Sequence, residues 1–198
     1  MRIPCDVIAR LSHVLPQSDD DPAMAAIRLD NGKVMATNRR FMAVEEVGAF
    51  EGVYYIAPDP KLIDICRTEA QYSSVIDFTP IDALKYTTAI TTLGAKFAEN
   101  IGVWPDGPTA WDNWRDLILA PCLEPLTATT GPMVFVAQGL AELAAASPSG
   151  IVVLEQFIDP MRPVVVRDVD SPSWVGFFRP KVMDGRHHAS ATVPEWCK

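Results

Sequence analysis

The stretch over residues 25–47, AAIRLDNGKVMATNRRFMAVEEV, constrains the fold of this chain most strongly. An apolar run enters an Asp-Asn-Gly turn at residues 30–32 and returns over residues 33–37. A second polar break at residues 38–40 leads into a third apolar run. Asn-Gly supplies the positive φ that a tight hairpin turn requires. The stretch therefore predicts three short strands in an antiparallel meander.

The bulk composition is that of a globular protein. The 198 residues have a mean hydropathy of +0.10 and are 48% hydrophobic, which is enough for one large domain or two small ones with a core. No apolar run approaches the roughly 20 residues of a membrane-spanning helix, and the first residues do not form a signal peptide. We therefore expect a cytoplasmic protein that makes no membrane contact.

Cysteine spacing argues against a disulfide-rich or zinc-binding protein, and the net charge argues against a uniformly basic one. Cys5, Cys66, Cys122 and Cys197 lack CxxC spacing, so neither a disulfide framework nor a zinc site is expected. The net charge of −8 argues against a protein coated with positive charge for nucleic acid. The net charge is still compatible with a local basic face on an otherwise acidic protein.

Two amphipathic helices are predicted in the first half of the chain. The first covers residues 5–17, and its apolar stripe is Val7, Ile8, Leu11, Val14 and Leu15. Its polar face consists of Asp6, Arg10, His13 and Gln17. The second begins at Asp59-Pro60, an N-cap followed by proline, and runs to about residue 71. It buries Leu62, Ile63 and Cys66 and presents Lys61, Asp64, Arg67 and Thr68.

The remaining elements suggest an internal repeat. A strand over residues 52–57 precedes the second helix, and strands over 74–79, 83–92 and 95–103 follow it. After a connector at 104–119 come a strand at 132–137, a helix at 139–146 and strands at 151–157, 162–169 and 174–178. VYYIA at 53–57 and MVFVA at 133–137 repeat the same motif, an apolar strand that leads into a helix. The pattern predicts an α+β fold of antiparallel sheets and helices in two pseudo-repeated modules.

The order of these elements resembles the DNA sliding clamps, specifically the bacterial DNA polymerase III beta subunit. The Ala-Thr-Asp-Gly-like turn of that family is similar to ATNRRFMA at residues 36–43. Its Phe-Pro-Asp-like connector is similar to WPD at 104–106 followed by NWRDL at 113–117, and its tail resembles WVGFFRPKVM at 174–183. The resemblance implies a clamp-like fold with helices on one face of the sheets. Residues 1–104 would form one complete domain, and 105–198 a connector and an abbreviated second domain.

The resemblance also implies a function without catalysis. A clamp-like chain would be a homo-oligomeric processivity or recruitment factor in DNA replication, with duplex DNA and polymerase peptide motifs as partners and no cofactor. The alternative is a non-ring protein-interaction module that keeps the clamp fold and does not encircle DNA. Six full domains close a family ring, so the abbreviated second domain bears directly on this choice.

The resemblance assigns residues to both kinds of partner. Basic side chains on the helices would contact phosphates without reading bases, namely Arg10, His13, Lys61 and Arg67. Ordinary solvated positions, diluted by nearby acids, are the alternative for these four residues. A pocket for client peptides would be formed by Thr37, Arg40, Phe41, Met42, Leu117, Pro180, Val182 and Met183. Met42, Leu117 and Val182 are equally compatible with core positions.

Other chemistry has little support in the sequence. Arg39 and Arg40 stand where the family has Gly and His in the turn, which would narrow the implied peptide pocket or favour acidic peptides. The histidines, His13 and the pair at 187–188, accompany no Walker, Rossmann or nucleophile-elbow signature, so no enzyme is expected. The acids at 19–21 and the histidine pair are more typical of solvated loops than of metal sites. The tryptophans at 104, 111 and 114 either anchor the connector or stack on single-stranded bases.

Overall fold

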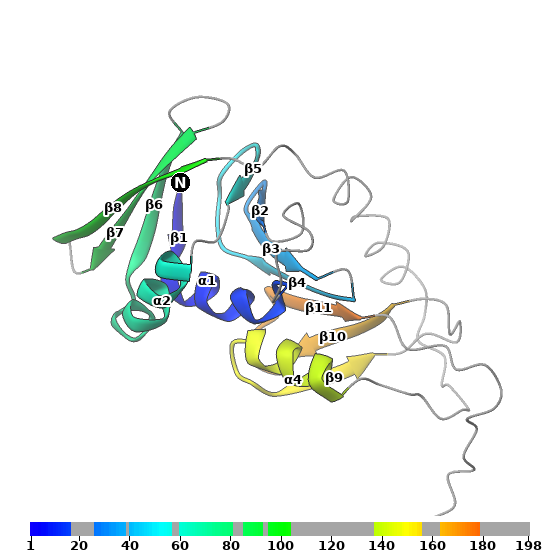
Figure 1. The fold of residues 1–198 in the computed structure, drawn as a ribbon. Coiled ribbons are helices and arrows are strands. Elements are labelled where there is room, and N and C mark those ends of the chain that lie inside the picture. Colours follow the sequence, from blue (N-terminus) through cyan, green and yellow to red (C-terminus); the bar gives the residue numbers. More distant parts are fainter. Residues whose placement is uncertain are drawn as a thin grey trace, which may run out of the picture.

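Two antiparallel sheets and a layer of helices make up the described part of the chain (Figure 1). The computed structural model describes residues 1–16, 26–38, 40–56, 60–80, 85–92, 95–103, 137–155 and 163–178. Within these ranges no helix is long and apolar enough to span a membrane.

The larger sheet has seven strands and contains the predicted meander. Asn31 and Gly32 have φ values of 46° and 85°, so the Asn-Gly turn is the left-handed hairpin turn that the sequence predicted. The strand order is β5 (Val53–Ile56), β2 (Ile27–Asp30), β3 (Lys33–Thr37), β4 (Phe41–Glu46), β11 (Trp174–Phe178), β10 (Val164–Asp168) and β9 (Val152–Glu155). The prediction of an antiparallel meander is confirmed.

The second sheet has four strands. Their order is β1 (Arg2–Pro4), β6 (Val75–Pro80), β7 (Lys85–Thr92) and β8 (Ala95–Val103). All three pairings are antiparallel, and β1 leads directly into the first helix. The strands predicted at 74–79, 83–92 and 95–103 are thus confirmed within a few residues at their ends.

Strands from both predicted modules share the seven-stranded sheet. Strand β11 pairs with β4 in the register Phe178 to Phe41 and Trp174 to Glu45. The sheet therefore runs from the meander into the C-terminal half without interruption. The predicted boundary after residue 104 falls next to residues that are not described, so the division into two domains stays a prediction.

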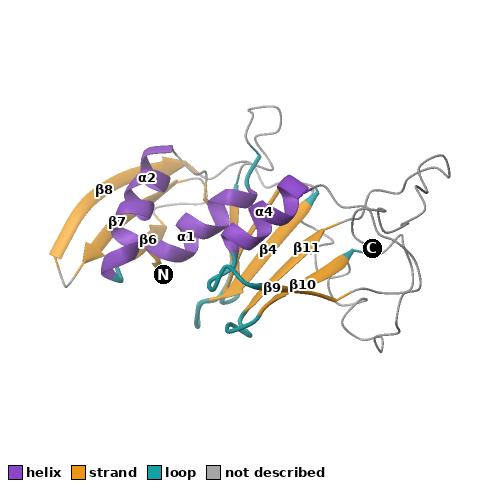
Figure 2. Ribbon diagram, turned by 90° about the horizontal axis from the view of Figure 1, so that it is seen from below, coloured by secondary structure: helices purple, strands orange, loops and turns teal. Residues whose placement is uncertain are grey.

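The helices lie on one side of both sheets, as Figure 2 shows from the helical side. The described helices are α1 (Cys5–Leu11), η1 (Ser12–Val14), α2 (Pro60–Glu69), η2 (Ala70–Tyr72) and α4 (Ala137–Ala146). The expected apolar stripe of the first helix is buried. The prediction for α2 is correct for Leu62 and Cys66, whereas Ile63 is only half-buried.

Two helix boundaries differ from the prediction. The first helix is α-helical only to Leu11 and ends after a 3-10 turn, because Leu15 is extended before Pro16 and the Ser12 hydroxyl donates to the Ala9 carbonyl at 2.6 Å. The second difference is Ala137, which begins α4 rather than ending a strand. The strand predicted before it, at 132–136, lies outside the described residues.

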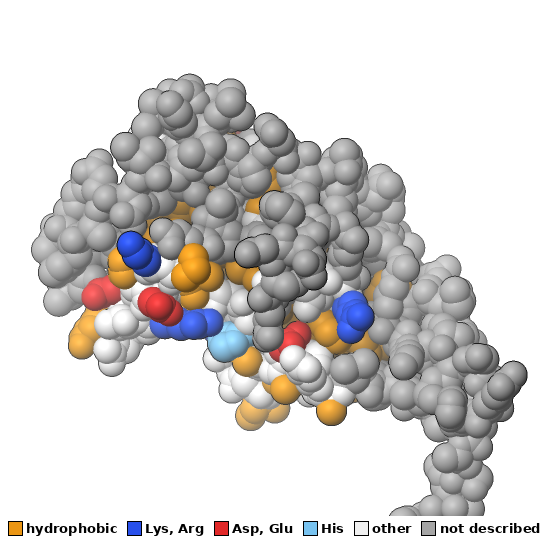
Figure 3. All heavy atoms as spheres, viewed as in Figure 1, with side chains coloured by type: hydrophobic (Ala, Val, Ile, Leu, Met, Phe, Trp, Pro, Cys, Tyr) orange, Lys and Arg blue, Asp and Glu red, His pale blue; other side chains and the backbone are white. Residues whose placement is uncertain are grey.

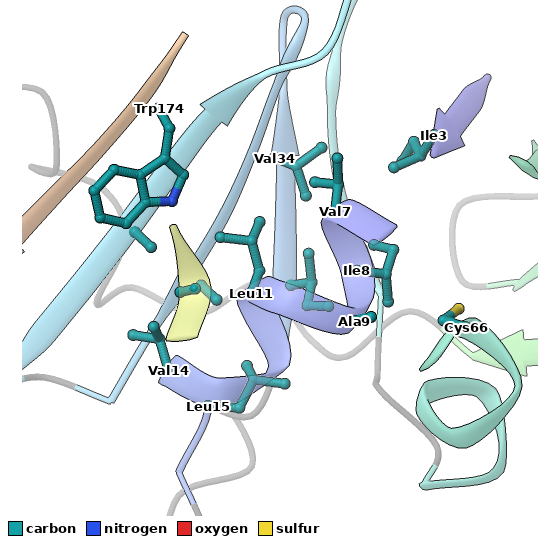
Figure 4. Packing of buried hydrophobic residues seen from close by; sticks show 14 of the residues in the cluster. Ile3, Val7, Ile8, Ala9, Leu11, Val14, Leu15, Val34, Cys66 and Trp174 are labelled. Carbon is teal, nitrogen blue, oxygen red and sulfur yellow. The ribbon is translucent and has the colours of Figure 1, made fainter. Parts of the chain in front are cut away.

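The main core lies between the helices and the seven-stranded sheet (Figure 4). Helix α1 sits at its centre, with Val7 beside Val34 of β3 and Ile8 directed toward α2. Helix α4 approaches β4 so closely that a Cβ on Gly139 would overlap the ring of Phe41. Any larger residue at position 139 would require the Phe41 ring to move.

The other face of the same sheet is also apolar. Strand alternation sends Phe41 and Ala43 of β4 into the main core and Met42 and Val44 into a second cluster. Met35, Val165 and Phe177 complete the second cluster, and all three are buried. Neighbouring residues of β4 therefore serve opposite faces of the sheet.

Candidate functional site

The residues predicted to bind phosphate all lie on the layer of helices. Helix α2 turns Leu62 and Cys66 inward, so Lys61, Asp64 and Arg67 lie on its exposed side. Helices α2, α1 and α4 follow one another across both sheets (Figures 1 and 2). The layer thus presents a continuous helical face along the described fold.

Arg67 connects two helices and stays half-exposed. Its Nη2 atom donates to the Ser12 hydroxyl of η1 at 3.1 Å, and its Nη1 atom lies 3.6 Å from Oδ1 of Asp64 one turn earlier on α2. The Arg67 side chain retains 50% of its accessible surface, and exposed ion pairs of this kind are weak. The guanidinium is held in place and is still accessible to a phosphate.

His13 lies next to this arginine at the end of the first helix. The imidazole is exposed. Partial desolvation lowers the pKa of His13, the positive charge of Arg67 lowers it further, and Glu142 of α4 opposes both effects. His13 is therefore neutral near pH 7 in the free protein.

Arg10 differs from the other three predicted residues. Its Nη2 atom donates to both carboxylate oxygens of Glu45 on β4, at 2.7 and 2.8 Å, and its Nη1 atom donates to Asp6. Glu45 is buried, and the Arg10 side chain keeps only 18% of its surface. Two carboxylates thus neutralise this guanidinium inside the fold. Its geometry is that of a structural ion pair, and its assignment to DNA stays a prediction.

The helical face carries both signs of charge. Figure 3 shows blue, pale blue and red side chains following one another along its lower side. Among the described residues, Lys61, His13 and Arg67 alternate with Asp64 and Glu142. The face is therefore less uniformly basic than the resemblance implied.

The four described residues of the predicted peptide pocket do not form one wall. The Thr37 hydroxyl is buried and donates to the Phe41 carbonyl at 2.7 Å. Phe41 packs in the main core against Phe178, with ring centroids 6.3 Å apart, whereas Met42 packs against the second cluster. Of this set Arg40 alone is exposed.

The rest of the predicted pocket lies outside the described residues. These positions are Leu117, Pro180, Val182 and Met183, and Arg39 belongs with them. The acids at 19–21, the histidine pair at 187–188 and the three tryptophans of the connector are outside as well. The peptide pocket therefore stays a prediction.

Sequence reasoning missed two residues that organise this surface. The side chain of Asn38 accepts hydrogen bonds from the backbone N–H groups of Arg40 and Phe41, at 3.1 and 2.9 Å, and its amide donates to Glu142 at 3.4 Å. Asparagine at the start of a tight turn is the available signal. Glu45 was missed too, although residues 41, 43 and 45 alternate onto the helix-facing side of β4.

Solved structures of sliding clamps share this fold. The beta subunit from DNA polymerase of Streptococcus pyogenes is 11% identical, with a TM-score of 0.62 over 92% of this chain and 66% of that one. The DNA polymerase sliding clamp from Bacillus subtilis is 12% identical, with a TM-score of 0.59 over 93% and 64%. The sliding clamp from Pseudomonas aeruginosa is 11% identical, with a TM-score of 0.61 over 92% and 66%.

These comparisons define the class of fold. The chain has a shortened α+β fold of the DNA sliding clamp type, and the resemblance seen in the sequence is confirmed at that level. It spans just under two-thirds of the length of the clamp structures that it matches, 64–66% for these three. No protein-family model and no curated protein sequence matches it.

Proposed function

We propose that this protein is a sliding-clamp-like processivity or recruitment factor that binds duplex DNA without sequence preference and also binds polymerase peptide motifs. The observation that carries the proposal is the helical layer, in which α2, α1 and α4 line one side of both sheets. Lys61, Arg67 and His13 are exposed on that side. The matching structures from Bacillus subtilis and Pseudomonas aeruginosa are DNA polymerase sliding clamps, which supports the same function.

The chemistry of such a surface is electrostatic. Side chains that meet phosphates release counterions from the duplex, and they carry no base-specific information. Binding of this kind falls steeply with salt and permits movement along the DNA. It needs accessible cations rather than a catalytic group. Arg67 is such a cation, because Ser12 and Asp64 hold its guanidinium while its side chain stays half-exposed.

The proposed assembly is a homo-oligomer of clamp-like domains. We propose that residues 1–104 form one complete clamp-like domain and that residues 105–198 form a connector with an abbreviated second one. A single copy spans about two-thirds of a matching clamp chain. Encirclement of a duplex by units of this kind would require self-association into a closed homo-oligomer.

A second candidate is a non-ring protein-interaction module with the same fold. The specific observation in its favour is the mixed charge of the helical face, where Arg67 is paired with Asp64 and Arg10 is paired with Glu45. A module of this kind would bind client peptides and would not encircle DNA. Duplex affinity at low salt separates the two candidates.

Replacement of Arg67 tests the helical face as a phosphate-binding surface. We expect Arg67→Ala to weaken duplex binding by about threefold to tenfold near 50 mM salt and to reduce the slope of log K against log salt by about one. Fluorescence anisotropy with labelled duplexes of two unrelated sequences measures both quantities. The same loss is expected for each sequence, because phosphate contacts do not read bases.

Arg2→Ala is the matched control for Arg67→Ala. Arg2 is an exposed arginine on β1 that pairs with Asp77, and it alternates with Ile3, which is buried toward the helices. It therefore lies off the helical face, and its loss changes the net charge by the same amount. Equal weakening by both variants, or no wild-type binding at low salt, would contradict the proposal.

A further inference from the structure

His13 occupies the point where three helices of the layer meet. Its neighbour Ser12 accepts a hydrogen bond from Arg67 of α2 at 3.1 Å. From α4, Glu142 acts on the imidazole, and its carboxylate is held by Gln138 at 3.0 Å and by Asn38 at 3.4 Å. The charges of a fixed cation on one helix and of a fixed anion on another thus act on an exposed titratable group.

Among the described residues, the other elements packed against η1 add no further free charge around the imidazole. Arg10 of α1 and Glu45 of β4 form their own ion pair, which Asp6 joins. Strand β3 turns the apolar side chains of Val34 and Ala36 toward the helices. Desolvation is the largest influence that lowers the pKa of His13, and of the two charges that act on it Arg67 outweighs Glu142.

A phosphate at this junction would reverse that balance. Its negative charge would offset the field of Arg67 and would accept a hydrogen bond from a protonated imidazole, which is a stronger interaction than one with the neutral ring. Binding a polyanion and binding a proton at His13 would then favour each other, since linkage is reciprocal.

We propose that duplex binding by the helical layer is coupled to uptake of one proton at His13, so that the affinity for DNA rises as the pH falls. The inference rests on the proposed function and adds its regulation. The proton comes from solvent and converts the neutral imidazole into an imidazolium, with no other bond made or broken. Acidification of the cytoplasm would raise the affinity of the protein for the duplex.

The size of the effect follows from the coupling. If a bound phosphate raises the pKa of His13 by about one unit, the affinity changes by at most about tenfold between pH 8 and pH 5.5. Backbone phosphates stay ionised over that range and do not contribute. The dependence should vanish when residue 13 cannot titrate.

The experiment measures duplex affinity against pH at constant ionic strength, with the full chain and three variants of its histidines. The wild type and the double variant His187→Gln/His188→Gln are expected to bind more tightly at pH 5.5 than at pH 8, by threefold to about tenfold. His13→Gln is expected to lose the dependence, so that its affinity at pH 5.5 equals its own affinity at pH 8. His13→Asn repeats the test with a shorter neutral side chain.

Proton uptake is measured independently by calorimetric titration of the wild type in two buffers that differ in ionisation enthalpy. Near pH 6.5 a net uptake is expected, which is absent in His13→Gln. A flat wild-type profile, or a His13→Gln profile as steep as the wild type, overturns the inference while duplex binding itself still supports the proposed function. Absence of duplex binding at every pH overturns both.

Discussion

Arg10→Ala is expected to lower the free energy of unfolding by about 3 kcal/mol at pH 7. The substitution leaves the Glu45 carboxylate buried without the guanidinium that contacts both of its oxygens. Removal of one partner of a buried ion pair costs about 3 to 5 kcal/mol, and the partial exposure of Arg10 places this case at the lower end. Urea unfolding followed by circular dichroism measures the loss.

The loss in Arg10→Ala should depend on pH with a defined sign. Burial raises the pKa of Glu45 above its usual value, and Arg10 opposes that shift. Without Arg10 the pKa of Glu45 rises further, so the folded state holds a proton that the unfolded state releases. The penalty is full above the folded-state pKa of Glu45 and disappears below its unfolded value near pH 4. The deficit relative to the wild type should therefore shrink on acidification.

A double variant serves as the control for Arg10→Ala. Arg10→Met/Glu45→Leu removes both charges and fills the space with apolar atoms, so it should recover most of the lost stability. Unchanged stability of Arg10→Ala together with a clear loss of duplex affinity would contradict the structural role of this residue. With that outcome, Arg10 would again belong with the residues predicted to bind phosphate.

Asp168→Ala is expected to destabilise the protein by about 3 kcal/mol. The Asp168 carboxylate is buried at the end of β10, and the Ser147 and Ser149 hydroxyls donate to it. The backbone N–H groups of Ser149, Asp170 and Ser171 also donate, each at 2.8 Å. Loss of the acceptor leaves these donors unpaired and detaches the end of α4 from the sheet.

The same carboxylate predicts the acid sensitivity of the wild type. Burial acts to raise the pKa of Asp168, but the hydrogen bonds from Ser147 and its neighbours outweigh it and hold the pKa at about 2. An acid with a depressed pKa stabilises the fold above its unfolded value near 4, and that stability is lost as the pH falls through 2. We expect this contribution, about 2 kcal/mol, to be absent in Asp168→Asn.

Asp170→Ala is the matched control for Asp168→Ala. Asp170 is exposed two positions away, and the cluster uses only its backbone N–H group. Thermal unfolding at pH 7 and pH 3 should separate the two variants, with Asp170→Ala close to the wild type. A small effect of Asp168→Ala at pH 7 would show that the serine donors find other acceptors.

Local signals were sufficient for most elements of the fold. Asn31 and Gly32 take positive φ values that few other residue pairs tolerate, so the first turn was predictable from two letters. Helix α2 was equally clear from Asp59-Pro60 and its apolar spacing. The pairing of β4 with β11 was not predictable, because residues far apart in the chain form it and no local pattern encodes that register.

The site was harder to predict than the fold, for a physical reason. A helical wheel places Arg10, His13 and Arg67 on polar faces alike, and it cannot show that Glu45 of a distant strand neutralises the first of them. The pocket prediction joined Phe41 with Met42, whereas strand alternation sends them to opposite faces of the sheet. Acids at inward-facing strand positions, such as Glu45 and Asp168, were the available signals for tertiary ion pairs and caps.

Retention on a duplex whose ends are blocked after mixing tests the proposed function most directly. A ring threads onto the free ends of a linear duplex and is trapped when both ends are then capped by a bulky protein. At about 1 M salt, where the Debye length is about 3 Å and phosphate contacts are screened, gel filtration separates bound from free protein. We predict that the protein stays on the capped duplex and leaves the uncapped one. Equal loss from both would contradict encirclement and favour the non-ring module.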